Sequence, residues 1–124
     1  MRALNVVVAQ LDARNAEHLA ASLYDHFRSV AVARSLEELR EAIPKNKADA
    51  AIVDLELIDL PGVADLHETY RKTTIVCTHR CADEEMWAAA LEAGASDMCS
   101  SQDVNGIIRC TLRSLNALAA TKAA

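Results

Sequence analysis

The sequence has few aromatic residues, few glycines and prolines, and no excess of positive charge, and these shortages exclude several classes of protein. Only 3% of the 124 residues are aromatic although 52% are hydrophobic, so the core has to be built from Ala, Val, Leu and Ile. The sequence has only three glycines and two prolines, and it contains no internal repeat, linker or low-complexity segment. The net charge of −5 argues against broad binding to nucleic acid, whose affinity comes from Lys and Arg on phosphates.

Long apolar stretches and disulfide-type cysteine patterns are also missing. No apolar run approaches the ~18 residues that a membrane span needs, and no such run follows a charged start as in a signal peptide. The four cysteines lack the density and spacing of a secreted disulfide scaffold. We therefore expect one cytoplasmic domain over residues 1–124, with residues 117–124 as a frayed tail or the start of a linker.

Strand-like and helix-like segments alternate along the chain. Short apolar runs predict strands at residues 4–8, 29–33, 49–54, 73–78 and 96–100. Apolar residues at helical spacing follow each run, in segments that begin near residues 12, 35, 61, 82 and 104. Five β-α units predict an α/β fold, a doubly wound parallel sheet with helices on both faces. The flavodoxin-like strand order 2-1-3-4-5 is the commonest at this size.

Several residues mark helix ends. Asp12 is a plausible N-cap, and Ser35 with Glu38 forms a capping box before the second helix, which Pro44 and the polar residues after it are expected to stop. Gly94 suits the position just after the fourth helix. Ser101 is most simply the N-cap of the last helix.

Asp54 is the residue of this sequence that most needs a functional explanation. It ends the apolar run of the third predicted strand, Ala-Ala-Ile-Val-Asp. In open α/β sheets, ligands and chemistry lie in the crevice outside the carboxyl ends of the strands. A strand-end Asp is otherwise a cap or a turn former, and this simpler interpretation stays open at this point.

Together these residues resemble the receiver domain of two-component response regulators, over nearly the whole chain. The resemblance makes Asp54 the phosphoacceptor position and Thr78, at the end of the fourth strand, the switch hydroxyl. Residues 90–95, Ala-Leu-Glu-Ala-Gly-Ala, match the motif that precedes the fifth strand in this family and are its most specific local match. Thr78 is about equally explained as a strand-end hydroxyl bonded to backbone.

The chain departs from the family at the positions that carry charge. Ala9 and Gln10 stand where receivers carry the two adjacent acids that hold Mg²⁺. Ser101 and Gln102 replace the Lys-Pro pair at the end of the fifth strand, and Met98 replaces the aromatic switch residue. Phosphoryl transfer to a carboxylate needs a cation on the phosphoryl oxygens, and Mg²⁺ prefers carboxylate and other oxygen ligands. We therefore expect no cofactor and no efficient Mg²⁺ binding, because only Asp54, a backbone carbonyl and the Gln10 amide oxygen remain as ligands. Asp12 and Asp59 are conceivable substitutes, but they are more simply a helix cap and a solvated loop acid.

The function expected from the resemblance is that of a signalling module regulated by partner binding or dimerisation, and not that of an enzyme. Its expected contact surface, for a protein partner or a second copy, is the fourth helix, fifth strand and fifth helix. An exposed Trp87 or Met86 there would mark a contact surface, and one of the two is expected to pack while the other is exposed. The alternative is a weakly active response regulator that a histidine kinase phosphorylates on Asp54.

Cysteine and histidine offer a second alternative. Cys77, His79 and Cys81 lie within five residues, and Cys99 falls on the next predicted strand, a grouping that suggests a zinc or redox sensor. Side chains alternate along a strand, which gives poor tetrahedral geometry, and buried free cysteines are usually apolar filler. Cys110 is expected to pack in the core or at an interface.

Overall fold

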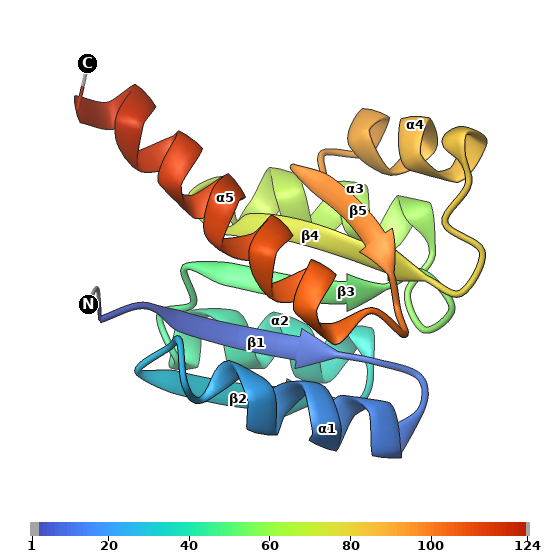
Figure 1. Cartoon of the computed structure of the whole chain (residues 1–124). Coiled ribbons are helices and arrows are strands. Elements are labelled where there is room, and N and C mark those ends of the chain that lie inside the picture. Colours follow the sequence, from blue (N-terminus) through green and yellow to red (C-terminus); the bar gives the residue numbers. More distant parts are fainter. Residues whose placement is uncertain (1–2, 124) are drawn as a thin grey trace.

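The computed structural model describes residues 3–123, and the side chains of this range as far as residue 117. Strands and helices alternate five times, as the sequence pattern predicts (Figure 1). The elements are β1 (Asn5–Ala9), α1 (Ala13–Leu23), β2 (Ser29–Ala33), α2 (Leu36–Lys45), β3 (Ala50–Asp54), α3 (Leu60–Thr69), β4 (Thr74–His79), α4 (Glu84–Glu92), β5 (Asp97–Ser100) and α5 (Val104–Ala123). None of the described helices is long and apolar enough to cross a membrane.

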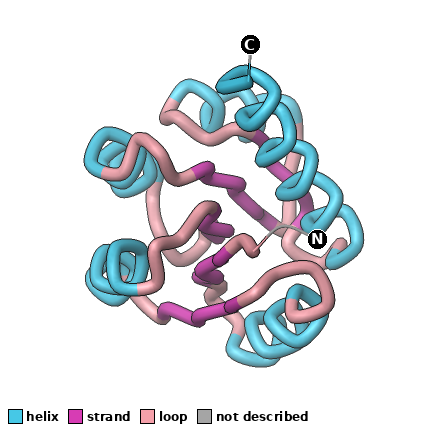
Figure 2. Tube along the Cα trace, turned by 90° about the vertical axis from the view of Figure 1, so that its left-hand side faces the viewer, coloured by secondary structure: helices cyan, strands magenta, loops and turns pink. Residues whose placement is uncertain are grey.

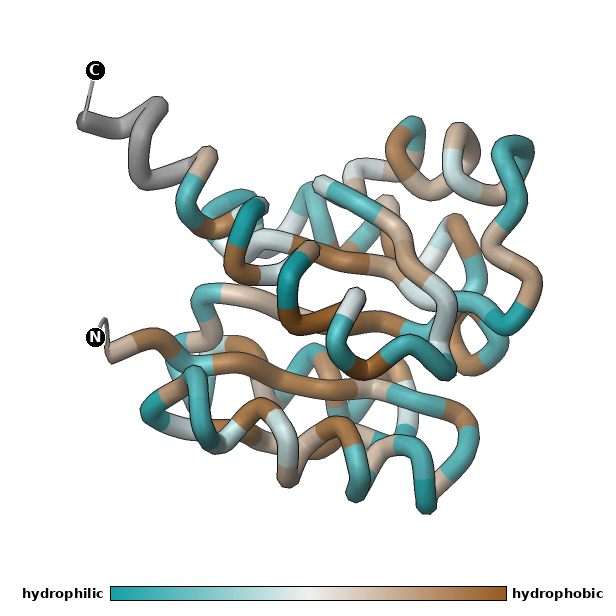
Figure 3. The backbone as a smooth tube through the Cα atoms, viewed as in Figure 1, coloured by the Kyte–Doolittle hydropathy of each residue, from teal (hydrophilic) through white to brown (hydrophobic). Residues whose placement is uncertain are grey.

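The five strands form one parallel sheet in the order β2-β1-β3-β4-β5, which confirms the predicted flavodoxin-like α/β fold. Its two faces are covered by helices, as the view in Figure 2 shows. Alternating side chains of β1 serve both faces: Val6 and Val8 point to one cluster of buried residues, and Val7 and Ala9 to the other. This explains why the central strands read as unbroken apolar runs, which colour them brown in Figure 3.

Different helices cover the two faces. On one face α1 and α5 contribute Leu19, Leu23, Ile107, Ile108 and Leu115 to the buried cluster. On the other face α2, α3 and α4 contribute Leu39, Ile43, Val63, Leu66 and Ala90. Helices therefore cover both faces of the sheet. The edge at which the carboxyl ends of the strands meet, its carboxyl edge, is the remaining place for a functional site.

The predicted helix ends are partly confirmed. The Asp12 carboxylate caps α1 and the Ser35 hydroxyl caps α2, as expected. Gly94 follows the C-cap of α4 with φ of +114°, a backbone conformation that suits glycine. Pro44 lies inside the last turn of α2, which ends one residue later, so it does not itself stop the helix.

The prediction that Ser101 caps the last helix is wrong. Asp103 takes that place, because its carboxylate accepts the N–H of Gly106 at 3.0 Å and its carbonyl accepts the N–H of Ile107 at 2.9 Å. Helix α5 then continues to Ala123, through most of the segment expected to fray. Residue 124 lies outside the described residues, and the assignment of the segment as a tail or linker stays a prediction.

Parallel register brings the ends of the strands together. Ala9 on β1 pairs with Val53 on β3, Asp54 pairs with Thr78 on β4, and His79 pairs with Ser100 on β5. Residues that the chain places up to 86 positions apart consequently meet at this edge.

Candidate functional site

Asp54 lies at the carboxyl edge of the sheet, 4% exposed, and two backbone groups hold its carboxylate. One oxygen accepts the N–H of Leu11 at 3.0 Å, from the loop after β1. The other accepts the N–H of Glu56 at 3.0 Å, from the loop after β3. Asp54 therefore fixes two loops to each other, in addition to ending its own strand.

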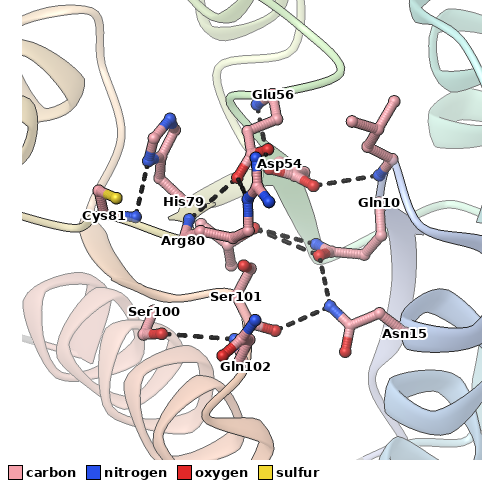
Figure 4. Close-up of polar contacts among 12 residues, drawn as sticks. Gln10, Asn15, Asp54, Glu56, His79, Arg80, Cys81, Ser100, Ser101 and Gln102 are labelled. Atoms are coloured by element: carbon pink, nitrogen blue, oxygen red, sulfur yellow. Dashed lines mark hydrogen bonds and ion pairs between the residues drawn. The ribbon is translucent and has the colours of Figure 1, made fainter.

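Beside Asp54, neutral polar groups form a connected set that we call the amide clamp: Gln10, Asn15, Thr78 and the carbonyl of Ser101 (Figure 4). The side-chain N–H of Gln10 donates to the Thr78 hydroxyl oxygen at 3.1 Å. The side-chain N–H of Asn15 donates to the Gln10 amide oxygen at 3.3 Å and to the Ser101 carbonyl at 2.8 Å. The amide clamp thus joins β1, α1, β4 and the loop between β5 and α5.

Most of the amide clamp is buried, with Asn15 half-buried, so its hydrogen bonds matter energetically. Thr78 is 0% exposed and Gln10 and Ser101 are 4% exposed. Within the described residues, no buried side-chain nitrogen or oxygen lacks a partner. A buried polar group that lost its partner would cost ~1–3 kcal/mol, so this set of bonds favours one arrangement of the site.

An ion pair between Arg80 and Glu56 lies beside Asp54 (Figure 4). The Arg80 guanidinium donates to both carboxylate oxygens of Glu56 at 3.0 Å, and the Arg80 backbone N–H donates to one of them at 3.1 Å. These bonds from Arg80 lower the pKa of Glu56, and the same pairing raises the pKa of Arg80. The Glu56 carboxylate is accordingly engaged by a cation of the protein itself.

These groups surround an open cavity of about 470 Å³ at the carboxyl edge. Its lining mixes acids with bases, which gives it no single sign of charge. The lining residues are Leu11, Asp12, Arg14, Asn15, His18, Asp54, Glu56, Arg80, Ser101 and Gln102.

The residues present do not fit a Mg²⁺ site of the kind that the resemblance implies. The first acid position is Ala9, which is fully buried in the apolar core, and the second is the Gln10 amide, which already bonds Asn15 and Thr78. Within the described residues, no three His, Cys, Asp or Glu side chains form a group able to hold a metal ion. Mg²⁺ is usually bound through one or two carboxylates with water and phosphate oxygens. Here two backbone N–H groups hold the Asp54 carboxylate, while Asp12 caps α1 and Glu56 pairs with Arg80.

The two substitute ligands that the sequence suggests serve as helix caps. Asp12 accepts the N–H of Arg14 at 2.9 Å and of Asn15 at 3.4 Å at the start of α1. Asp59 accepts the N–H of Gly62 at 2.9 Å at the start of α3, so this exposed acid caps the helix.

The remaining predicted site positions are buried. Ser101 donates its backbone N–H to the His79 carbonyl at 3.2 Å, and Met98 packs in the core cluster that α2, α3 and α4 cover. Sequence reasoning missed Asn15, although its position three residues after the cap Asp12 places it in the first turn of α1, beside the site. It also missed Arg80, whose role depends on the conformation of the loop after β4.

The cysteines do not gather as the zinc alternative requires. Cys77 lies in the core cluster of the α2, α3 and α4 face, where burial raises its pKa to about 12, whereas Cys81 is exposed. The His79 ring accepts the N–H of Cys81 at 2.9 Å. Cys99 lies on the opposite face of the sheet, near Cys110 of α5.

On α4 the expected division between two large side chains is confirmed. Trp87 is 47% exposed, while Met86 packs against the core.

No protein-family model and no curated protein matches the chain. Solved structures do match it closely. NtrX from Brucella abortus is similar at a TM-score of 0.87 and 16% identity, over 98% of this chain and 28% of that one. The RcsB response regulator of Salmonella typhimurium is similar at 0.81 and 16%, over 94% of this chain and 61% of that one. This chain therefore spans less than two thirds of either protein.

A third match has nearly the same length as this chain. A putative response regulator from Chloroflexus aurantiacus is similar at a TM-score of 0.82 and 22% identity, over 93% of this chain and 99% of that one. The fold is thus that of response-regulator receiver domains, as the sequence resemblance implies.

Proposed function

We propose that this chain is a receiver-type signalling module of the two-component kind, whose site is held by the amide clamp instead of being switched by Mg²⁺-dependent phosphorylation of Asp54. The single observation that carries the proposal is the bond from the Gln10 amide to the buried Thr78 hydroxyl at 3.1 Å. It engages the hydroxyl that the resemblance assigns to switching, from a position that the resemblance assigns to a metal ligand.

The chemistry of the site supports this proposal. Transfer of a phosphoryl group to a carboxylate depends on positive charge that stabilises the phosphoryl oxygens. Around Asp54 the amide clamp is neutral, Ser101 stands in the position of the family's lysine, and the nearby Arg80 is paired with Glu56. These features favour a site that is well ordered but has little capacity to accept a phosphoryl group on Asp54.

A module without phosphorylation needs another input. We propose that a protein partner or a second copy supplies it through α4, β5 and α5, where Trp87 is exposed. Such a ligand shifts the protein between two states only by its difference in affinity for them. The proposal includes a cytoplasmic protein that is not an enzyme and does not itself bind nucleic acid.

A second candidate function is a weak phosphoacceptor that a histidine kinase phosphorylates on Asp54. The observation that favours it is the position of Asp54, which lines the open cavity at the carboxyl edge and pairs in register with Thr78.

Thermal unfolding in Mg²⁺ separates the two candidates. A metal that binds the folded chain stabilises it by RT ln(1 + [Mg²⁺]/Kd), about 2.7 kcal/mol at 100 times Kd. We expect MgCl₂ to change the melting temperature of the wild-type chain no more than that of Asp54→Asn, at ionic strength matched with NaCl. A saturable rise that Asp54→Asn abolishes would contradict the proposal. A conventional receiver measured in parallel controls for the sensitivity of the assay.

A further inference from the structure

Two cysteines from different elements face each other beside the free edge of the sheet. Cys99 lies on the edge strand β5 and Cys110 in the second turn of α5, and both are half-buried. The Cys99 sulfur lies 3.8 Å from the carbonyl of Gly106, which is one helical turn before Cys110. Residues four apart lie on one face of a helix, so Cys110 faces β5 as Gly106 does, beside Cys99. Figure 1 shows β5 running between α4 and α5, and Cys99 packs against the cluster on the α5 side of the sheet.

Charged groups engage one of the two sulfurs. The Arg113 guanidinium donates to the Cys110 sulfur at 3.6 Å and to the Asp97 carboxylate at 2.8 Å. Burial raises the pKa of Asp97, but Arg113, Met98, Cys110 and Trp87 together lower it, so Cys110 and Trp87 both lie close to this carboxylate. The pair is therefore connected through Asp97 to the exposed tryptophan of α4.

We propose that Cys99 and Cys110 form a reversible disulfide, a modification site that ties β5 to α5 when a peroxide oxidises the protein. The disulfide would close a short loop, from residue 99 to residue 110, and both thiols already lie on facing elements. The 3.8 Å separation of the Cys99 sulfur and the Gly106 carbonyl places β5 close to the first turns of α5. This proposal is independent of the phosphorylation state of Asp54.

The chemistry balances with hydrogen peroxide as the oxidant. The Cys110 thiolate attacks one peroxide oxygen, the O–O bond breaks, and the departing hydroxide takes a proton to become water, which leaves a sulfenic acid on Cys110. The Cys99 sulfur then attacks the Cys110 sulfur, the S–S bond forms, and the hydroxyl leaves with the Cys99 proton as a second water. In total two thiols and one peroxide give one disulfide and two waters. A dithiol reductant reverses the modification by exchange.

The surroundings assign the two roles. Burial and the nearby Asp97 raise the pKa of the Cys110 thiol, while Cys99 and the charge of Arg113 act in the opposite direction. Burial and the hydrogen bond to Cys110 both raise the pKa of Cys99. Cys110 is thus the attacking sulfur and Cys99 the resolving one, and the first step is slow because little thiolate is present at neutral pH.

Disulfide formation changes the face around α4, β5 and α5. It moves the Cys110 sulfur, which accepts a hydrogen bond from Arg113, and Arg113 in turn donates to Asp97, whose carboxylate lies close to Trp87. We therefore expect the fluorescence of Trp87 to report the modification. It also gives this face a second input beside partner binding.

Peptide mapping tests the pair directly in the full-length chain. Trypsin cleaves after Arg80, Arg109 and Arg113, so Cys99 and Cys110 fall in separate peptides, 81–109 and 110–113. The exposed Cys81 shares the first peptide with Cys99, and Cys81→Ser removes that ambiguity. After treatment of folded Cys81→Ser protein with millimolar hydrogen peroxide and alkylation of free thiols, we expect the two peptides linked, with the loss of two hydrogens. Dithiothreitol should separate them.

The controls are Cys99→Ser and Cys110→Ser in the same background, each of which should abolish the link and the change in Trp87 fluorescence. Peptides 81–109 and 110–113 that stay unlinked in folded, peroxide-treated protein would overturn the proposal, whether the thiols remain reduced or are oxidised to sulfonic acid. A link that forms without any change in Trp87 fluorescence would overturn its effect on the surface.

Discussion

The residue type at position 10, a glutamine, determines the chemistry of the site. A carboxylate there would be charged and could only accept hydrogen bonds, whereas the amide both donates and accepts. It donates to Thr78 at 3.1 Å and accepts from Asn15 at 3.3 Å. The same position therefore serves as a structural connector between β4 and α1.

Replacing Gln10 with Leu should destabilise the fold. The change keeps the bulk of the side chain but leaves the buried Thr78 hydroxyl without its donor and Asn15 without one acceptor. We expect the free energy of unfolding to fall by about 1–3 kcal/mol, measured by urea denaturation. Gln102→Leu, at an exposed position on the same edge, is the matched control. Equal effects of the two substitutions would show that the amide clamp contributes nothing.

The sequence predicts the positions of Asp54, Gln10 and Thr78 because each follows from where an apolar strand ends. It does not predict that Asn15 joins them. That contact depends on how α1 is rotated and on a backbone carbonyl 86 residues away, at Ser101. Neither of these depends on the type of residue at one position.

At the scale of elements, one ion pair joins the edge strand β5 to α5. Asp97 accepts from the Arg113 guanidinium and from the backbone N–H of Met98, both at 2.8 Å. Burial alone would raise the pKa of Asp97, but these hydrogen bonds outweigh it and hold the pKa below its ordinary value of 3.8. The two elements are thus connected by a bond that requires an ionised carboxylate.

This lowered pKa predicts a pH dependence of stability. A carboxyl whose pKa is depressed on folding adds stability that is present above its unfolded pKa and is lost as the pH falls through the folded one. We expect the melting temperature of the wild type to fall relative to that of Asp97→Asn as the pH drops below about 4. The gain should be modest, because the Arg113 partner of Asp97 is 71% exposed and solvent screens such a pair. If the melting temperatures of the wild type and Asp97→Asn changed equally with pH across this range, the assignment of a stabilising ionised carboxylate to Asp97 would be contradicted.

The start of α5 shows where reasoning from residue type fails. Ser and Asp are both good N-caps, and the sequence offers Ser101 and Asp103 two positions apart. The structure uses Asp103, because Ser101 is still held to the end of β4 through its N–H and to α1 through its carbonyl. Tertiary contacts thus decide between two locally equivalent caps.

Asp103→Ala should accordingly weaken α5. Loss of the bond to the Gly106 N–H is expected to lower the free energy of unfolding by about 0.5–2 kcal/mol in chemical denaturation. Asp25→Ala, which removes an exposed acid outside the helices, provides the control for a change of charge. If Asp103→Ala behaves like Asp25→Ala, another group caps the helix.

At the scale of the whole molecule, the sequence predicts the architecture well because both faces of the sheet are buried. Val6, Val7, Val8 and Ala9 are all fully buried, which produces the continuous apolar runs of a doubly wound fold. The proposed contact surface at α4, β5 and α5 is different, because a surface patch leaves no comparable pattern of buried residues in the sequence. The exposed Trp87 and the Cys99–Cys110 pair are the features by which its state can be followed.

The measurement that tests the central claim most directly is the intact mass of the chain after incubation with acetyl phosphate and Mg²⁺. Asp54→Ala and a conventional receiver are treated in parallel, the first to identify the site and the second to show that the reaction works. Our account predicts that the folded wild-type chain gains no phosphoryl group while the conventional receiver is labelled. A phosphoryl adduct on the wild type that disappears in Asp54→Ala would contradict it, because the site would then work without the paired acids and the lysine.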